Sequence, residues 1–355
     1  MYGYGYKYTS GLVVGAGGTP LDTTFKITVD TTKAGSASDT FVLPLQIATT
    51  NMTIYWGDGN SDLITAYNQA ELTHVYSVGG IYQITLDGPF GGVKYRNLGD
   101  KLKISSIDNW GSNVWSSMKW AFWGCSNMVA NYSDSPDTSL VLDMSNAFHT
   151  CTNFNGSVDF NTSSATSMTY MFYNCTNFNQ PVNFNTTSVS NVILMFGSCT
   201  NFNQPITFNL PNCTSLYLMF SSCTLLNEAI NITTSSLLVT CTSMLKLCTS
   251  LNSLVTISNT SSVTTMQSMF QQCTVFDQDI SSFDISSLTN ATNMMLASGF
   301  SVTNYDLLLV SWQGKTHNNS VNLHAGTAKY NAGAPATARA GLITDSWTIT
   351  DGGAV

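Results

Sequence analysis

The chain has 355 residues, of which only 9% are charged, and its formal net charge is −8. Soluble globular proteins carry about 25% charged residues, so this surface depends on uncharged polar side chains instead. With only 12 Lys and Arg spread along the chain, the composition argues against a nucleic-acid binder and against a polybasic membrane patch. No run of about 18 apolar residues is present, so we expect no membrane insertion.

Residues 1–20 are rich in Gly and Tyr and show no regular period. We interpret them as an N-terminal tail that either anchors the chain to other virion or surface proteins or forms a flexible terminus. The first residues also lack the apolar core of a secretion signal. This favours a protein that is used or assembled in the cytoplasm, or exported by another route.

Residues 21–102 are predicted to form a small antiparallel β-sandwich. Alternating apolar residues at 25–29 and 81–86, and apolar runs at 40–45 and 52–56, indicate short strands. Turn-forming Gly, Asp and Asn residues separate these strands, as is typical of a sandwich.

Three spaced elements within this region resemble the signature of a known family. They are Trp56-Gly57-Asp58-Gly59, then His74-Val75-Tyr76, then Gly80-Ile81-Tyr82-Gln83-Ile84. In this order they resemble the PKD domain, an immunoglobulin-like β-sandwich of surface and extracellular proteins. The resemblance implies a spacer or adhesion module.

A phrase of about 24 residues recurs between residues 103 and 312, and a constant period of this length predicts a solenoid. Its clearest copies begin at Met171-Phe172 and Met195-Phe196. The cysteines that mark the copies are 26, 24, 24, 24, 25 and 25 residues apart: Cys125, Cys151, Cys175, Cys199, Cys223, Cys248 and Cys273. In each coil we expect one strand, such as 182–184, and one short helix, such as 192–196, which is the plan of leucine-rich repeats.

The nine cysteines are expected to be mostly buried free thiols. Stacked coils place equivalent residues in a file about 5 Å apart, and free Cys behaves as a small, readily buried apolar residue. Some disulfides are the alternative. No Cys-x-x-Cys pair is present to indicate zinc.

The repeated phrase, Met-Phe-x-x-Cys-x-x-Phe-Asn-Gln-x-Ile/Val, resembles the BspA-like leucine-rich-repeat family of bacterial surface lipoproteins and phage proteins. The copies near Cys125 and Cys248 depart from the phrase, and Ser298 stands where the next cysteine would fall. The resemblance implies a repeat solenoid that displays a surface. Residues 313–355 lose the period and are predicted to cap the open end of the array, with strands at 320–326 and 347–350 and a helix at 334–342.

The candidate site residues are Asn179, Gln180, Asn203 and Gln204, which recur at one position of successive coils. Two interpretations remain open. The amides form an internal ladder that stiffens the solenoid, or they form a face that binds a glycan or a protein.

Other chemistry is weakly supported by the sequence. Asp58, Asn60 and Asp62 alternate like the first half of a calcium loop, although a β-turn explains the same residues. Gly314-Lys315-Thr316 ends like a phosphate-binding loop but lacks the earlier glycine. His74 is expected to be structural and His149 to lie on the lateral surface. We expect no catalytic residues, no resident metal and no cofactor.

The sequence thus predicts a mainly β protein with short helices: a PKD-like sandwich, a leucine-rich-repeat-type solenoid and a C-terminal cap. The expected function is structural and adhesive, on a bacteriophage virion as a fibre, spike or capsid decoration that contacts host-surface glycan or protein. An exported bacterial surface adhesin is the alternative. A polysaccharide hydrolase is a remote third, because it needs paired carboxylates. The sequence does not indicate the oligomeric state.

Overall fold

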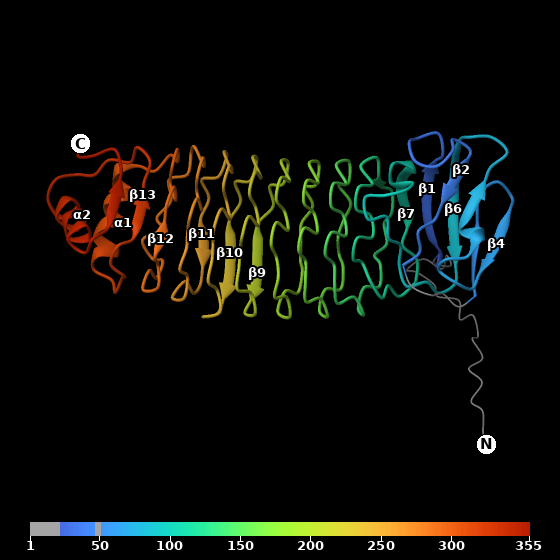
Figure 1. The fold of residues 1–355 in the computed structure, drawn as a ribbon, viewed down its shortest axis with the longest axis horizontal. Coiled ribbons are helices and arrows are strands. Elements are labelled where there is room, and N and C mark those ends of the chain that lie inside the picture. The colour runs from blue at the N-terminus through green and yellow to red at the C-terminus, as the bar shows by residue number, and fades with distance from the viewer. Residues whose placement is uncertain (1–21, 47–50) are drawn as a thin grey trace, which may run out of the picture.

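The computed structural model describes residues 22–46 and 51–355, and it is mainly β with two α-helices. An elongated column of stacked coils joins an N-terminal module at one end to the helices α1 (Val302–Gln313) and α2 (Ala334–Thr344) at the other (Figure 1). The predicted fold class, mainly β with a stacked-coil solenoid, is confirmed. The predicted tail, residues 1–20, lies outside the described residues.

The N-terminal module contains a six-stranded sheet with the order β4-β3-β6-β1-β7-β8 and a two-stranded ribbon, β2-β5. In β1 every second side chain is buried, which is the pattern of a strand with one face on a core. The strands are β1 (Phe25–Asp30), β2 (Thr40–Val42), β3 (Met52–Tyr55), β4 (Ser61–Ile64), β5 (Thr73–Val75), β6 (Ile81–Asp87), β7 (Ile104–Asn109) and β8 (Val129–Ala130); 3-10 turns cover Ala70–Leu72 and Lys101–Lys103.

Strand β7 connects the module to the solenoid. It pairs antiparallel with β1 of the module and parallel with β8 of the first coil. The sheet therefore continues across the boundary that the sequence places between residues 102 and 103. At this boundary Lys103 is fully buried, and its ammonium donates to the carbonyl oxygens of Ala37 and Thr40 at 2.7 Å each.

In the middle coils the strands β9 (Ile206–Leu210), β10 (Ile230–Thr234) and β11 (Val255–Ile257) form a parallel sheet in register. Each side chain lies beside its equivalent one repeat later, and alternate residues point into the core. The segment 182–184, predicted as a strand, follows the same alternation of buried and exposed residues but is not part of a named strand.

The short helix predicted at 192–196 is wrong. Leu194 and Ser198 have positive φ angles of 53° and 61°. This left-handed conformation interrupts a right-handed helix of L-residues. Two turns form instead, closed by Met195 N–H on the Val192 carbonyl and by Cys199 N–H on the Phe196 carbonyl. Other N–H groups of this segment, such as that of Phe196, donate to the next coil. The N–H groups that would bond within a helix therefore bond to the neighbouring coil instead.

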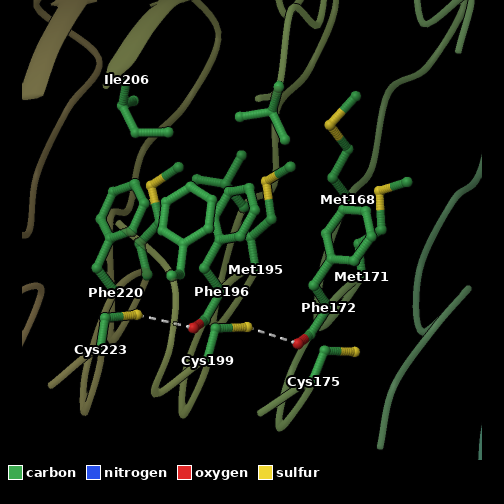
Figure 2. Packing of buried hydrophobic residues seen from close by; sticks show 14 of the residues in the cluster. Met168, Met171, Phe172, Cys175, Met195, Phe196, Cys199, Ile206, Phe220 and Cys223 are labelled. Carbon is green, nitrogen blue, oxygen red and sulfur yellow. Dashed lines mark hydrogen bonds between the residues drawn. The ribbon is translucent and has the colours of Figure 1, made fainter. Parts of the chain in front are cut away.

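Columns of equivalent side chains form the core (Figure 2). The rings of Phe172, Phe196 and Phe220 lie parallel, with centroids 5.6 and 5.4 Å apart. The column continues toward the module through Phe148 and Phe122, at 5.5 and 5.6 Å. Because each ring is covered on both faces by its neighbours, no coil can bury its core alone.

All nine cysteines are buried and free, which confirms the expected thiol ladder. Six of the seven ladder thiols donate to the carbonyl of the Phe or Leu that begins the turn in the preceding coil, over 2.8–3.2 Å, as Cys199 does to Phe172 (Figure 2). Burial raises the pKa of each thiol, so the ladder stays protonated and unreactive.

At the C-terminal end, β12 (Asn290–Ala291), β13 (Asn322–His324) and β14 (Thr348–Thr350) extend the parallel stacking, with α1 and α2 as the connections between them. Helix α2 and the strands β13 and β14 lie where the sequence predicts a helix and two strands. Helix α1 was not predicted. The boundary that the sequence places between the repeat array and the cap, after residue 312, falls at the end of this helix. Asp351 holds this end together by accepting from Arg339 at 2.6 Å and from Tyr305 at 2.8 Å.

Candidate functional site

The predicted residues Asn179 and Asn203 belong to a ladder that runs along one edge of the solenoid. The side-chain oxygen of Asn179 accepts from the backbone N–H of Asn203 at 2.9 Å, and that of Asn203 accepts from Asn227 at 2.8 Å. The same contact recurs from coil to coil, joining Asn155, Asn179, Asn203, Asn227, Asn252, Asp277 and Ser301.

The two predicted glutamines each add a second bond to their rung. Gln180 donates to Asn155 at 3.2 Å, and Gln204 donates to Asn179 at 3.0 Å. The structure therefore engages all four predicted residues in contacts between coils. Since the acceptor oxygens of Asn179 and Asn203 already bond to the next backbone, their first role is structural.

A different feature has the character of a binding site. An open groove of about 1110 Å³ lies beside the N-terminal module and crosses the first coils. It is defined here as the junction groove, and its lining residues come from a loop of the module and four coils: Arg96, Asn97, Leu98, Lys119, Trp120, Trp123, Asp143, Ser145, Asn146, His149, Ser167, Thr169, Tyr170 and Asn191.

A loop of the module, residues 95–97, bonds to the first coil as another coil would, and so it extends the groove. Arg96 N–H donates to the Trp120 carbonyl, and Asn97 N–H donates to the Trp123 carbonyl. Tyr95 then stacks on Phe122 as the next member of the aromatic column, at 6.3 Å. The groove therefore begins where the repeat meets the module.

Three cations surround the indole of Trp120. Lys94, Arg96 and Lys119 lie 4.7, 4.8 and 4.9 Å from its ring centroid. Lys119 also pairs with Asp143 at 2.7 Å. Burial raises the pKa of Asp143, but hydrogen bonds from Lys119 and Ser145 outweigh this effect, and its pKa lies below the ordinary value.

Parallel aromatic rings line the groove beyond Trp120. Trp123 stacks on His149 at 4.8 Å, and His149 stacks on Tyr170 at 5.7 Å. His149 Nδ1 lies 2.8 Å from Asn146 Oδ1, which requires the nitrogen to donate. Burial lowers the pKa of His149 to about 4, so the ring is neutral at pH 7.

Asp143 is the single carboxylate among the described residues that line the junction groove. Glycoside hydrolysis through two carboxylates has no second partner there. What the groove offers is apolar ring surface, hydroxyl and amide groups, and cations, which is chemistry suited to binding.

The other sites considered from the sequence have structural partners. Asp58 bonds to His74 at 2.8 Å, and Asp62 accepts from the indole N–H of Trp56 at 2.7 Å. Lys315 donates to the Phe283 carbonyl at 2.7 Å, which ties the cap to the last coil. Within residues 22–46 and 51–355, no group of three His, Cys, Asp or Glu is placed to hold a metal ion. None of the helices described is both long and apolar enough to span a bilayer.

The junction groove was not predicted from the sequence, because the basic residues were interpreted as dispersed along the chain. Five of the 12 Lys and Arg lie between residues 94 and 119. The repeat positions that hold Trp120 and Trp123 in the first coil hold Leu194 and Gly197 three coils later. Both signals were readable from an alignment of the repeat copies with each other.

Comparison with known proteins gives a family but no named relative. No curated protein and no solved structure matches the chain. The model of one family, described as "Mycoplasma protein of unknown function, DUF285", matches residues 116–234 and again residues 214–334. Together these matches cover the repeat array and the start of the cap, which is more than half of the chain. The chain therefore belongs to the DUF285 family and has the architecture of a repeat surface protein.

Proposed function

We propose that this chain is a non-enzymatic structural and adhesion protein that binds a glycan or protein on a host surface through the junction groove. The observation that carries the proposal is the groove itself. It is open, it combines aromatic, polar and cationic side chains, and it lies on the side of a column whose core is fully packed.

The architecture supports display rather than catalysis. The coils bury their thiols and their phenylalanine rings in shared columns, so the thiols are withdrawn from solvent. The outward side chains are mostly Ser, Thr and Asn. A rigid rod of this type holds a recognition surface at a distance from its point of attachment.

Display on a bacteriophage virion is the location we propose, with other virion proteins as partners through residues 1–20. The surface of a bacterial cell is the alternative. A PKD-like spacer role for residues 21–102 belongs to the same proposal, and its support is the sheet and ribbon whose core holds Trp56 and Tyr76.

Two measurements test the proposal. The labelled full chain should bind intact host cells in a saturable manner, and mass spectrometry should find it in purified particles. Detection on intact bacterial cells instead of particles, with loss of the signal after protease treatment of the cells, would favour the alternative location. Absence of saturable binding to any cell or surface extract would contradict adhesion.

A further inference from the structure

We propose that the junction groove binds an acidic glycan, an oligosaccharide whose carboxylate or sulfate groups contact Arg96 and Lys119 in the groove and Lys94 beside the same indole. The hydroxyl groups of its sugars would bond to the polar side chains of the following coils. This inference rests on the proposed adhesive function and specifies the ligand class for the same site.

The first argument is charge. The chain carries a net charge of −8, yet three of its 12 basic residues converge on one indole ring. Within the described residues, Lys94 and Arg96 have no carboxylate within ion-pair distance, and only Lys119 is paired, with Asp143. Three like charges around one ring repel each other, and a bound anion relieves this repulsion.

The second argument is the polar lining beyond the cations. Asp143, Ser167 and Asn191 are side by side on consecutive coils, joined by parallel bridges. Around them lie the hydroxyl groups of Ser145 and Thr169. These groups repeat at the spacing of the coils, about 4.8 Å, so the groove presents rows of donors and acceptors over about 10 Å. A polyhydroxylated chain can use such rows along its length, whereas a small anion cannot.

The arrangement of the rings distinguishes a glycan from a single-stranded nucleic acid. Base recognition of that kind needs exposed ring faces on which bases stack. Here Trp123, His149 and Tyr170 cover each other's faces, and cations surround Trp120. Few ring faces are therefore left for bases, and the polar groups and cations of the groove are the main sources of specificity.

The row of rings beside the groove has a defined end, which limits the length of the ligand. Tyr173 continues the row of Trp123 and His149, and it packs across Gly197 of the next coil. A Cβ atom at Gly197 would lie 2.6 Å from the Leu194 side chain and 3.1 Å from that of Tyr173. The row of rings thus stops at the fourth coil, so we expect an oligosaccharide of a few sugars to fill the site.

The experiment uses the full chain on a glycan array that carries oligogalacturonate, sialylated and sulfated oligosaccharides beside neutral counterparts of the same length. The strongest acidic glycan is then titrated against the native chain, the double variant Arg96→Gln/Lys94→Gln, and the control Lys246→Gln. Lys246 occupies, three coils after Tyr173, the same repeat position. The control therefore removes a cation from the same face without touching the groove.

We expect binding to at least one acidic class and little to the neutral counterparts. The double variant should lose about 10- to 100-fold in affinity, which corresponds to about 1.4–2.8 kcal/mol for the two lost charge contacts together. The control should bind like the native chain. Affinity should also fall as salt rises, a measurement that needs no variant.

Several outcomes would overturn the inference. These are equal binding of acidic and neutral glycans, equal loss in the control, and competition by polyglutamate or an oligonucleotide as strong as by the glycan. Cell binding that survives the double variant would refute the ligand class while adhesion stands. Acidic-glycan binding without any cell binding would support the ligand class and refute adhesion.

Discussion

The junction of the module with the first coil differs sharply from the middle of the solenoid. Residues 94–119 contain seven charged side chains, whereas residues 190–275 contain two, Glu228 and Lys246. In the middle, each buried group repeats in the next coil, so stability is spread over many equivalent contacts. At the junction each contact occurs once. The repeat supplies a uniform scaffold, and the place where it is interrupted carries the unusual chemistry.

The largest effect we expect is the loss of the buried cation at the junction. Lys103→Met removes one donor from each of the Ser36, Ala37 and Thr40 carbonyls and leaves Asp100 without the ammonium that lies 3.8 Å away. Removing one partner of such a buried cluster costs about 3–5 kcal/mol. Urea unfolding should show this loss, and hydrogen exchange should place it in β1 and β7.

The matched control is Lys246→Met on a middle coil, for which we expect a change within about 0.5 kcal/mol. If both variants unfold at the same urea concentration, the junction does not depend on this cluster. The junction and the middle coils would then not differ in stability in the way expected here.

The next effect concerns the amide ladder of the middle coils. Asn179→Ala/Asn203→Ala removes two acceptors for backbone N–H groups, at about 1 kcal/mol each, so we expect a loss of about 2 kcal/mol. Asn183→Ala is the control, because Asn183 is exposed and bonds to no residue of the described chain. Unchanged thermal stability together with lost adhesion would instead assign these residues to a ligand face.

A smaller effect separates the two ends of the phenylalanine column. Phe196→Leu should cost about 1 kcal/mol, because Leu245 already occupies the same position in a later coil. Phe122→Leu should cost more, because Phe122 also packs against Trp110 and Trp115 at the junction. Equal melting temperatures of the two variants would contradict this difference.

The sequence predicted the features that repetition determines. A constant spacing of Cys and Phe forces equivalent residues to stack, so the thiol ladder and the column of Phe172, Phe196 and Phe220 followed directly from the period. The turn segment was predicted as a helix because leucine-rich repeats have one strand and one short helix in each coil. Hydrogen bonds to the neighbouring coil determine the conformation of this segment. These bonds cannot be predicted from the sequence of one coil alone.

The junction groove was harder to predict because it depends on residues far apart in the sequence. Arg96 lies in the module, Trp120 in the first coil and Tyr170 in the third, and each has an unremarkable local context. Only the pairing of residues 95–97 with the turn at 120–123 brings them together. Helix α1 was missed for a related reason: its apolar residues continue the composition of the array, although the period has ended.

The last predicted effect is a pH dependence at the junction that the middle coils lack. The pKa of His149 falls from its ordinary 6.5 to about 4 in the folded chain, so between these values the unfolded chain binds more protons. Stability must therefore decrease as pH falls from about 6.5 to 4. His149→Phe keeps a flat ring between Trp123 and Tyr170 but does not titrate, so its melting temperature should fall less over this range. Because carboxylates elsewhere also titrate below pH 5, the difference between native and variant chains is the quantity to measure. If the melting temperatures of the two chains run parallel from pH 7 to 4, His149 takes up a proton as readily in the folded groove as in the unfolded chain. The stacked row of rings then does not exclude a charged imidazole.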